Sequence, residues 1–164
     1  MRKKILRSAL FLLLLTVAAL PLSAQPRYKG AGYGFLAFGG NVEGNSESLT
    51  SLGGGGEAVF NNGLGFRMDV GFFGPIDNLS AGIGALSPGM LYEFTVEKKT
   101  SAFVGGGYTL FFRDDTLNGI HFGGGVRHWF TRGFGIRVEA RDEVPLIDGR
   151  SFHNVFARFS FLFR

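Results

Sequence analysis

The sequence predicts an all-β protein, an eight-stranded antiparallel up-and-down transmembrane β-barrel preceded by a cleaved signal peptide. Three observations lead to this prediction. Apolar and polar residues alternate with period two, and no segment after Gln25 shows the 3.6-residue period of a helix. The charged residues of the alternating segments fall on one face, which is also rich in glycine. The connections between the segments alternate between shorter and longer ones.

The N-terminal segment 1–24 has the layout of a secretory signal peptide. Its first seven residues carry four basic side chains and no acidic one, and an apolar run follows over Ala9–Leu20. Small and turn-forming residues then lead to Ala24, after which we expect cleavage. The apolar run is shorter than the ~20 residues that a membrane-spanning helix needs. The expected mature chain is 25–164, and its length suits one barrel domain.

Three segments show the strand alternation most clearly, namely 64–73, 134–141 and 154–163. In each of them every second residue is apolar, and mostly large, over a long stretch. Because side chains two apart lie on the same face of a strand, each segment presents one continuous apolar face.

Five further segments have weaker alternation, and glycine clusters lower their strand propensity. Their spacing nevertheless predicts strands near 28–40, 53–61, 80–94, 101–112 and 119–130. The connections left between the eight strands are then about 41–52, 62–63, 74–79, 95–100, 113–118, 131–133 and 142–151. Tight turns at one end and longer loops at the other are typical of bacterial outer-membrane barrels.

The two faces of the predicted strands differ in charge. Nine charged residues share the glycine-rich face and are expected to form a luminal ion-pair network: Glu57, Arg67, Asp69, Glu93, Arg127, Arg137, Glu139, Arg141 and Arg158. The opposite face carries no charge, and its expected members are Tyr33, Phe35, Phe60, Phe66, Met68, Val70, Met90, Tyr92, Val104, Tyr108, Leu110, Phe112, Ile120, Phe122 and Val126.

A secreted soluble barrel is the alternative, with the apolar face turned inward. Three features favour the transmembrane arrangement. The charged face is dense in glycine and carries both signs nearly in balance, as an ion-paired interior requires. The chain has no cysteine, so it lacks the disulfide that secreted soluble barrels usually carry. The alternating loop lengths are the third feature.

Composition excludes several other classes of protein. Four of the 17 basic residues and none of the 13 acidic residues lie in 1–24, so the mature chain is neutral. This balance argues against nucleic-acid binding. Without cysteine there is no disulfide scaffold, no Cys-ligated metal site and no Cys nucleophile.

Three stretches carry a family resemblance. The stretch 123–141 combines a glycine-rich strand, a tight turn and an inward Glu/Arg pair, 105–108 reads Gly-Gly-Gly-Tyr, and 159–163 reads Phe-Ser-Phe-Leu-Phe. They resemble the penultimate hairpin, the preceding strand and the C-terminal strand of the small outer-membrane β-barrel family, the OmpA/OmpX-like eight-stranded proteins. That family typically ends on the aromatic residue itself, whereas Arg164 follows Phe163 here.

The resemblance implies a location in the outer membrane of a Gram-negative-type bacterium, in contact with outer-membrane lipid and lipopolysaccharide. It also implies that Phe159, Phe161 and Phe163 form the C-terminal assembly signal that the barrel-assembly machinery recognises. Periplasmic chaperones would accompany the chain during biogenesis.

Charge is expected to differ between the two barrel ends. If the mature N-terminus starts in the periplasm, the external loops carry two bases, Arg113 and Arg150, and eight acids: Glu43, Glu47, Asp77, Asp114, Asp115, Asp142, Glu143 and Asp148. The periplasmic turns and ends carry one acid, Glu97, and six bases: Arg27, Lys29, Lys98, Lys99, Arg132 and Arg164. Two interpretations stay open for the acidic loops, either plain solvated charge or shared binding of divalent cations, which prefer carboxylate oxygens.

Motifs for catalysis or cofactor binding are few. The dinucleotide-like spacing at Gly32, Gly34 and Ala37 falls inside a strand, where the required helix is missing. His121 and His128 are seven residues apart and so lie on opposite faces of one strand, unable to share a metal. We therefore expect no catalytic, cofactor or metal site.

Two functional alternatives accompany the expected non-enzymatic role in membrane integrity or surface interaction. One is a narrow channel for small or hydrophobic solutes. The other is a lipid A-modifying barrel enzyme, for which His153 with Ser151 and either Asp148 or Glu143 has suitable residue types at the outer rim.

Overall fold

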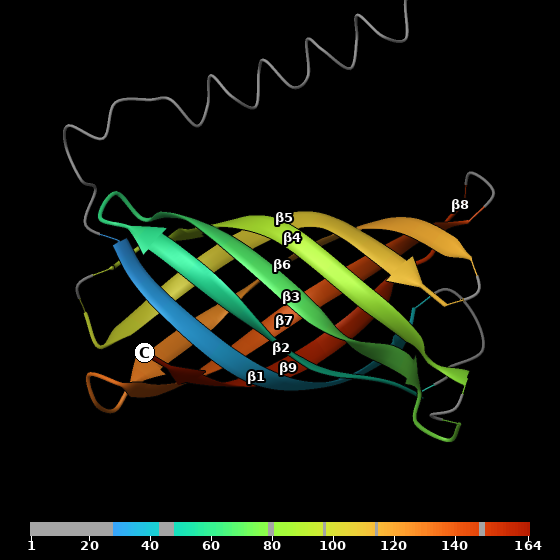
Figure 1. The fold of residues 1–164 in the computed structure, drawn as a ribbon, viewed down its shortest axis with the longest axis horizontal. Coiled ribbons are helices and arrows are strands. Elements are labelled where there is room, and N and C mark those ends of the chain that lie inside the picture. The colour runs from blue at the N-terminus through green and yellow to red at the C-terminus, as the bar shows by residue number, and fades with distance from the viewer. Residues whose placement is uncertain (1–27, 43–47, 79–80, 97, 114, 148–149) are drawn as a thin grey trace, which may run out of the picture.

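The computed structural model describes residues 28–42, 48–78, 81–96, 98–113, 115–147 and 150–164, which form a closed antiparallel β-barrel (Figure 1). The predicted signal peptide 1–24 lies outside the described residues. The strands are β1 (Tyr28–Asn41), β2 (Ser48–Phe60), β3 (Leu64–Pro75), β4 (Ile83–Glu93), β5 (Thr100–Phe112), β6 (Thr116–Trp129), β7 (Phe134–Ile147), β8 (Arg150–Ser151) and β9 (Asn154–Phe163). Within these ranges no helix is long and apolar enough to cross a membrane.

Eight of these strands close the ring. Strands β1 to β7 pair in sequence order, β9 pairs with β7, and the ring closes where β9 pairs with β1. The two-residue strand β8 pairs only with the end of β7. A closed ring leaves no long strand edge with unpaired backbone groups, which is the condition for strands to cross hydrocarbon. The predicted fold class is therefore confirmed.

Several strands run further than side-chain alternation predicted, whereas β4 is shorter, at Ile83–Glu93 instead of 80–94. Strand β2 begins at Ser48 instead of residue 53, and β7 continues to Ile147 instead of 141. In these extensions backbone pairing persists, with Leu49 opposite Gly39 and Glu143 opposite Asn154. The side chains there no longer alternate cleanly between apolar and polar, because these strand ends extend beyond the band of outward apolar residues. The alternation therefore predicted strands that are too short.

Short turns gather at the barrel end where the C-terminus lies (Figure 1), here named the turn end. It comprises residues 60–64, 94–96, 98–100 and 130–134 together with Lys29 and Arg164. Gly63 adopts φ 88°, a left-handed conformation that disfavours other residues, and its amide donates to the carbonyl of Phe60. The opposite end, with the described residues 42, 76–78, 81–82, 113, 115 and 150–153, is named the loop end.

Exposure alternates along each strand, with large apolar side chains outside and charged ones inside. In β3, Met68 and Val70 are each 53% exposed, whereas Arg67 and Asp69 are 6% and 3% exposed. The predicted inward charges and outward apolar residues of this strand are thus correct.

Strand β1 departs from the predicted faces. Tyr33 is buried in a cluster with Ala31, Trp129 and Leu162, and Phe35 packs against that cluster, so both rings point inward. Leu36 and Phe38 are exposed on the outside instead. The prediction was wrong here because both faces of β1 are apolar or small, so no charge near its middle marked the inner one.

Aromatic rings line the outer surface near the turn end. Phe130 stacks on Phe134, which in turn stacks on Phe161, with centroid distances of 6.0 Å and 6.4 Å. On another part of the barrel wall, the ring of Tyr92 packs edge-on against that of Phe94, with a centroid distance of 5.3 Å. Aromatic girdles of this kind flank the apolar band of transmembrane barrels.

Candidate functional site: the barrel lumen

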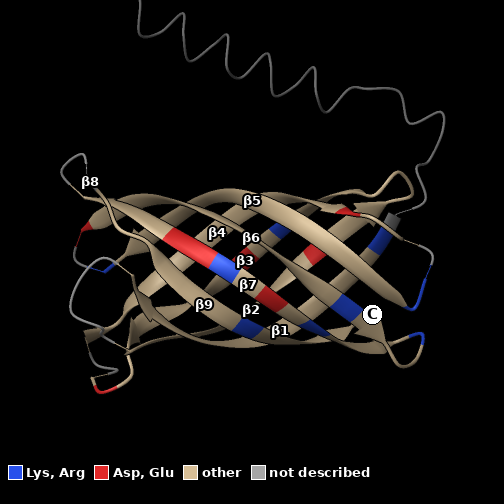
Figure 2. Cartoon of the chain, turned by 180° about the vertical axis from the view of Figure 1, so that it is seen from behind, with Lys and Arg blue, Asp and Glu red and all other residues tan. Residues whose placement is uncertain are grey.

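The lumen holds all nine charged residues that the sequence assigned to it. Each is between 1% and 6% exposed. They reach the interior because they occupy alternate positions on β2, β3, β4, β6, β7 and β9, and Figure 2 shows the charged segments along the barrel wall. Glycines beside them make room. A Cβ at Gly55, for instance, would lie 2.7 Å from Tyr33 Oη.

Nearest the turn end, two carboxylates bind two arginines. Glu57 accepts from Arg127, and its second oxygen accepts from Arg137 Nη1 at 2.8 Å. Arg127 Nη2 also donates to Glu93 at 2.6 Å, and Ser101 donates to the other oxygen of Glu93. Every carboxylate oxygen in this layer thus has a donor, as buried charges require.

The middle of the lumen is crossed by two bidentate arginine–carboxylate pairs. Arg67 donates to both oxygens of Glu139, at 3.0 Å and 2.8 Å. Arg158 donates to both oxygens of Asp69, at 3.0 Å and 2.8 Å. Such pairs are the stronger and more directional form of ion pair.

Asp69 is the most connected carboxylate among the described residues. Besides Arg158, Arg141 Nη1 donates to it at 2.7 Å, and the Tyr33 hydroxyl donates to it as well. Arg67 Nε lies 3.6 Å from the same carboxylate. One side chain on β3 therefore ties β1, β7 and β9 together.

Several of the pairs cross the lumen from one wall to the opposite one. Arg67 on β3 and Glu139 on β7 lie four strands apart in a ring of eight, on opposite walls, as do Glu57 on β2 and Arg127 on β6. Arginine side chains are long enough to cross this narrow lumen, where the glycines leave space.

Aromatic rings cover two of the guanidinium groups. The Cζ atom of Arg137 lies 4.2 Å from the ring centroid of Tyr33, and that of Arg158 lies 3.6 Å from the centroid of Phe35. Cation–π contact adds stabilisation where the cation is removed from water. The inward turn of these two rings therefore belongs to the ionic network.

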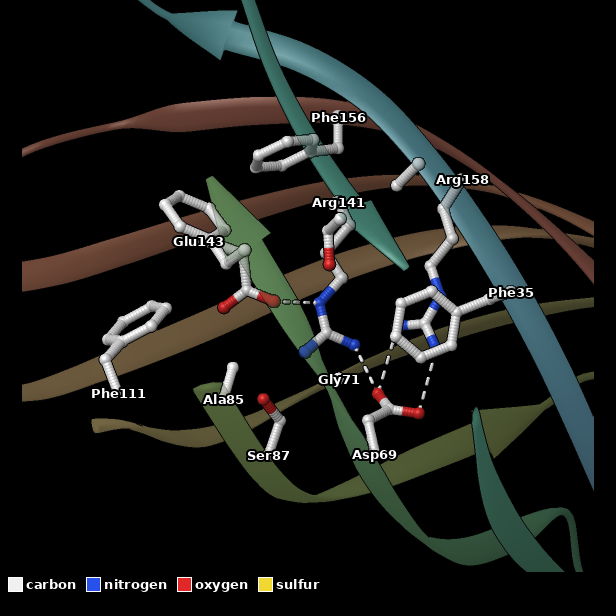
Figure 3. Close-up of a pocket in the computed structure, with 13 residues that line it drawn as sticks. Phe35, Asp69, Gly71, Ala85, Ser87, Phe111, Arg141, Glu143, Phe156 and Arg158 are labelled. Carbon is white, nitrogen blue, oxygen red and sulfur yellow. Dashed lines mark hydrogen bonds and ion pairs between the residues drawn. The ribbon is translucent and has the colours of Figure 1, made fainter. Parts of the chain in front are cut away.

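Towards the loop end the lumen becomes aromatic. Figure 3 shows Arg141 between Asp69 and Glu143, with Phe35 in front of Arg158. Beyond them Phe73 contacts the rings of Phe111 and Phe156 at centroid distances of 5.4 Å and 5.5 Å. The cavity enclosed by these groups measures about 20 Å³, which is room for roughly one water molecule.

Glu143 belongs to this luminal layer and not to an external loop, as the sequence had suggested. It lies in β7, accepts from Arg141 Nε at 2.6 Å and accepts from Thr109 Oγ1 at 2.9 Å. Thr109 also lies 2.9 Å from His121 Nδ1 and 3.1 Å from Ser87 Oγ. The sequence analysis missed this extension of the network through Glu143, Thr109, His121 and Ser87, although the period-two rule places 143 on the face of 139 and 141.

The structure describes three of the four residues considered for lipid A chemistry, namely Glu143, Ser151 and His153. His153 Nδ1 lies 2.6 Å from Asp142 Oδ2, while Glu143 turns into the lumen. Ser151 is exposed in β8, and Asp148 lies outside the described residues. His121 points inward, whereas His128 bonds Thr100 and contacts the ring of Phe130.

The predicted acidic loop residues are only partly described. Asp77 and Asp115 are exposed at the loop end, and Glu43, Glu47, Asp114 and Asp148 lie outside the described residues. Asp142 was wrongly placed in a loop, because β7 extends through it. Among the residues that the structure describes, no three His, Cys, Asp or Glu side chains gather as a metal site would need.

The three C-terminal aromatic residues all face outward. Phe159, Phe161 and Phe163 are 50%, 63% and 55% exposed on β9, whose intervening side chains are buried. This strand closes the ring against β1. Their role as an assembly signal stays a prediction.

Solved structures with this fold are small outer-membrane β-barrels. Neisserial surface protein A is 13% identical, with a TM-score of 0.64 over 83% of this chain and 96% of that chain. The N-terminal β-barrel domain of Pseudomonas aeruginosa OprF is 13% identical, with a TM-score of 0.55 over 84% and 100%. A de novo designed transmembrane β-barrel is 13% identical, with a TM-score of 0.55 over 84% and 98%. No protein-family model and no curated protein sequence matches the chain.

Proposed function

We propose that the chain is a small integral outer-membrane protein without enzymatic activity, whose barrel serves membrane integrity or surface interaction and whose lumen is closed to solutes. The observation that carries the proposal is the inverted distribution of polarity. Side chains such as Val70 face outward while the nine luminal charges are buried. This distribution is stable in hydrocarbon, because the closed ring pairs the polar backbone groups and the lumen encloses the charged side chains.

The network supports a closed lumen. Arginine–carboxylate contacts of 2.6–2.8 Å fill it in two layers, one through Glu57 and Glu93 and one through Glu139 and Asp69. The aromatic layer of Phe73, Phe111 and Phe156 lies beyond them towards the loop end. A solute would have to separate buried ion pairs to pass, which costs several kcal/mol for each pair.

The location is tested by cell fractionation followed by gels of unboiled and boiled samples. We expect the protein in the outer-membrane fraction and a mobility change on boiling, since a closed barrel stays folded in detergent until it is heated. A protein in the soluble fraction with unchanged mobility would refute a membrane barrel.

The closed lumen is tested by conductance in planar bilayers. We expect no steady single-channel current from the natural protein. A steady current would replace the closed-lumen proposal with the narrow-channel alternative. Mass spectrometry of lipid A from cells with and without the gene then tests the non-enzymatic part of the proposal, for which we expect identical spectra.

Interactions follow from the same orientation. With the turn end in the periplasm, the loop end meets lipopolysaccharide, and its acidic residues are proposed to share divalent cations with it. Equal loop mobility with and without Mg²⁺ would contradict the cation proposal. Phe159, Phe161 and Phe163 are proposed to engage the barrel-assembly machinery, so replacing all three by alanine should lower the amount of folded protein in the membrane.

A further inference from the structure

The turn end of the barrel has a wide basic mouth. A cavity of about 410 Å³ opens there, within the size range of small-molecule sites. Five cations line it, namely Lys29, Lys98, Lys99, Arg132 and Arg164. The described lining residues include no Asp or Glu side chain. Figure 2 shows the same concentration of basic residues at the end where the C-terminus lies.

Strands from opposite walls bring these cations together. Lys29 begins on β1 and donates from Nζ to the carbonyl of Val96, in the turn between β4 and β5. Arg164 follows β9, and its backbone amide donates to Gly133 at 3.1 Å. These contacts position Lys29 and Arg164 at the mouth, so that both side chains stay beside the cavity instead of extending into solvent.

Trp129 forms an aromatic part of the same cavity. Its side chain is 7% exposed, and the Arg164 guanidinium lies 3.9 Å from its ring centroid. Cation–π contact orients the guanidinium while leaving its N–H groups available to a ligand. The site therefore combines fixed donors with an apolar wall.

Among the described residues, the carboxylates of the adjoining luminal layer are already paired. Glu57 and Glu93 accept from Arg127, Arg137 and Ser101. Partial burial and the charge of Arg127 lower the pKa of Arg164, while the charges of Glu93 and Glu57 act in the opposite direction. Glu97 lies in the same turn but outside the described residues.

We propose that this basic mouth binds a phosphate-bearing anion. Lysine and arginine are the usual ligands of phosphate groups, and five of them around one cavity match a ligand with two or more negative charges. Such chemistry comes either from a free phosphate compound or from the headgroup of an anionic lipid in the adjacent leaflet.

Trp129 provides the readout, because it is the chain's single tryptophan. The folded full-length barrel, in vesicles of phosphatidylcholine, is titrated with inorganic pyrophosphate while tryptophan fluorescence is recorded. We expect a saturable change, absent when sodium chloride is added to equal ionic strength. A change of the same size with sodium chloride, or no change with any phosphate compound, would overturn the proposal.

A double variant and a matched control assign the effect to this end of the barrel. K98Q with R132Q should raise the Kd for pyrophosphate at least tenfold, since both cations line the cavity. The loop-end variant R113Q should leave it within twofold. Equal Kd values in the double variant and the natural protein would contradict the assignment, and heat-modifiable mobility of each variant checks that it folds.

The two ligand sources are separated by the vesicle lipid. If the natural ligand is a lipid headgroup, vesicles containing phosphatidylglycerol should change Trp129 fluorescence without pyrophosphate and should compete with it. If the ligand is a free phosphate compound, phosphatidylglycerol should leave both the fluorescence and the pyrophosphate Kd unchanged.

Discussion

The two faces of β3 place opposite chemistry on neighbouring residues. Arg67 and Asp69 are almost fully buried in the lumen, while Met68 and Val70 are each 53% exposed on the outside. In a water-soluble barrel these assignments would be reversed. The contrast indicates that charged side chains are buried where they pair in the lumen, and that apolar side chains are exposed where the outer surface meets hydrocarbon. Removing a charge from the lumen and adding one to the outer surface should therefore both lower the free energy of unfolding.

Removing a luminal charge should have the largest effect. Asp69→Asn keeps the shape of the side chain but leaves Arg158 without its paired carboxylate and Arg141 with only Glu143. We expect the free energy of unfolding to fall by about 3–5 kcal/mol, the usual cost of breaking a buried ion pair. Urea unfolding in lipid vesicles, followed by gel mobility, measures it.

Asp115→Asn serves as the control, since Asp115 is an exposed residue at the loop end. Its effect should stay within about 0.5 kcal/mol, as for most surface substitutions. Equal losses for the two variants would mean that the luminal pairs contribute nothing beyond surface charge. Adding Arg158→Gln to Asp69→Asn should recover part of the loss, because the unpaired cation is then removed.

Adding a charge to the outer face should have the next largest effect, and it should depend on depth. Val70→Arg near the middle of β3 is expected to cost about 2–4 kcal/mol, whereas Leu64→Arg at the start of the strand should cost about 0–1 kcal/mol. Both residues lie on the same face of one strand, so their difference isolates depth in the membrane. The same unfolding assay compares them, and equal costs would argue against a hydrocarbon belt.

Changing an aromatic ring at the loop side of the lumen should have the smallest effect. Phe111→Leu conserves most of the volume and loses the ring contact with Phe73. We expect a loss of about 0.5–1.5 kcal/mol, typical of an aromatic pair. A loss as large as that of Asp69→Asn would show that aromatic packing, and not ion pairing, dominates the lumen.

Side-chain chemistry alone was enough to predict much of this barrel. Segments such as 64–73 and 154–163 form strands at nearly the predicted bounds, because an apolar residue at every second position builds one continuous apolar face only on a β-strand. All nine luminal charges were likewise assigned to the correct face. An unpaired charge is too costly to remain in hydrocarbon, so each charged residue could be assigned to the inner face before its ion-pair partner was known.

The prediction was wrong where the type of a residue does not indicate whether it faces the lumen or the outside. Tyr33 and Phe35 look like outward aromatics, but they point inward and lie against Arg137 and Arg158. Glu143 looks like a loop acid, yet it lies on β7 and accepts from Thr109 and Arg141. The two rings contact residues far away in the sequence, whereas Glu143 could have been placed by continuing the period-two rule from 139 and 141.

The sequence by itself thus determined the number of barrel strands, their approximate bounds and the inward charges, because these depend on local alternation and on the cost of burying charge. Only the tertiary structure decided which partners meet, through closure of the ring. Closure sets Arg67 opposite Glu139 across the lumen and brings Lys29 beside Val96 at its basic mouth. Neither contact follows from spacing along the chain, since each joins residues more than sixty positions apart.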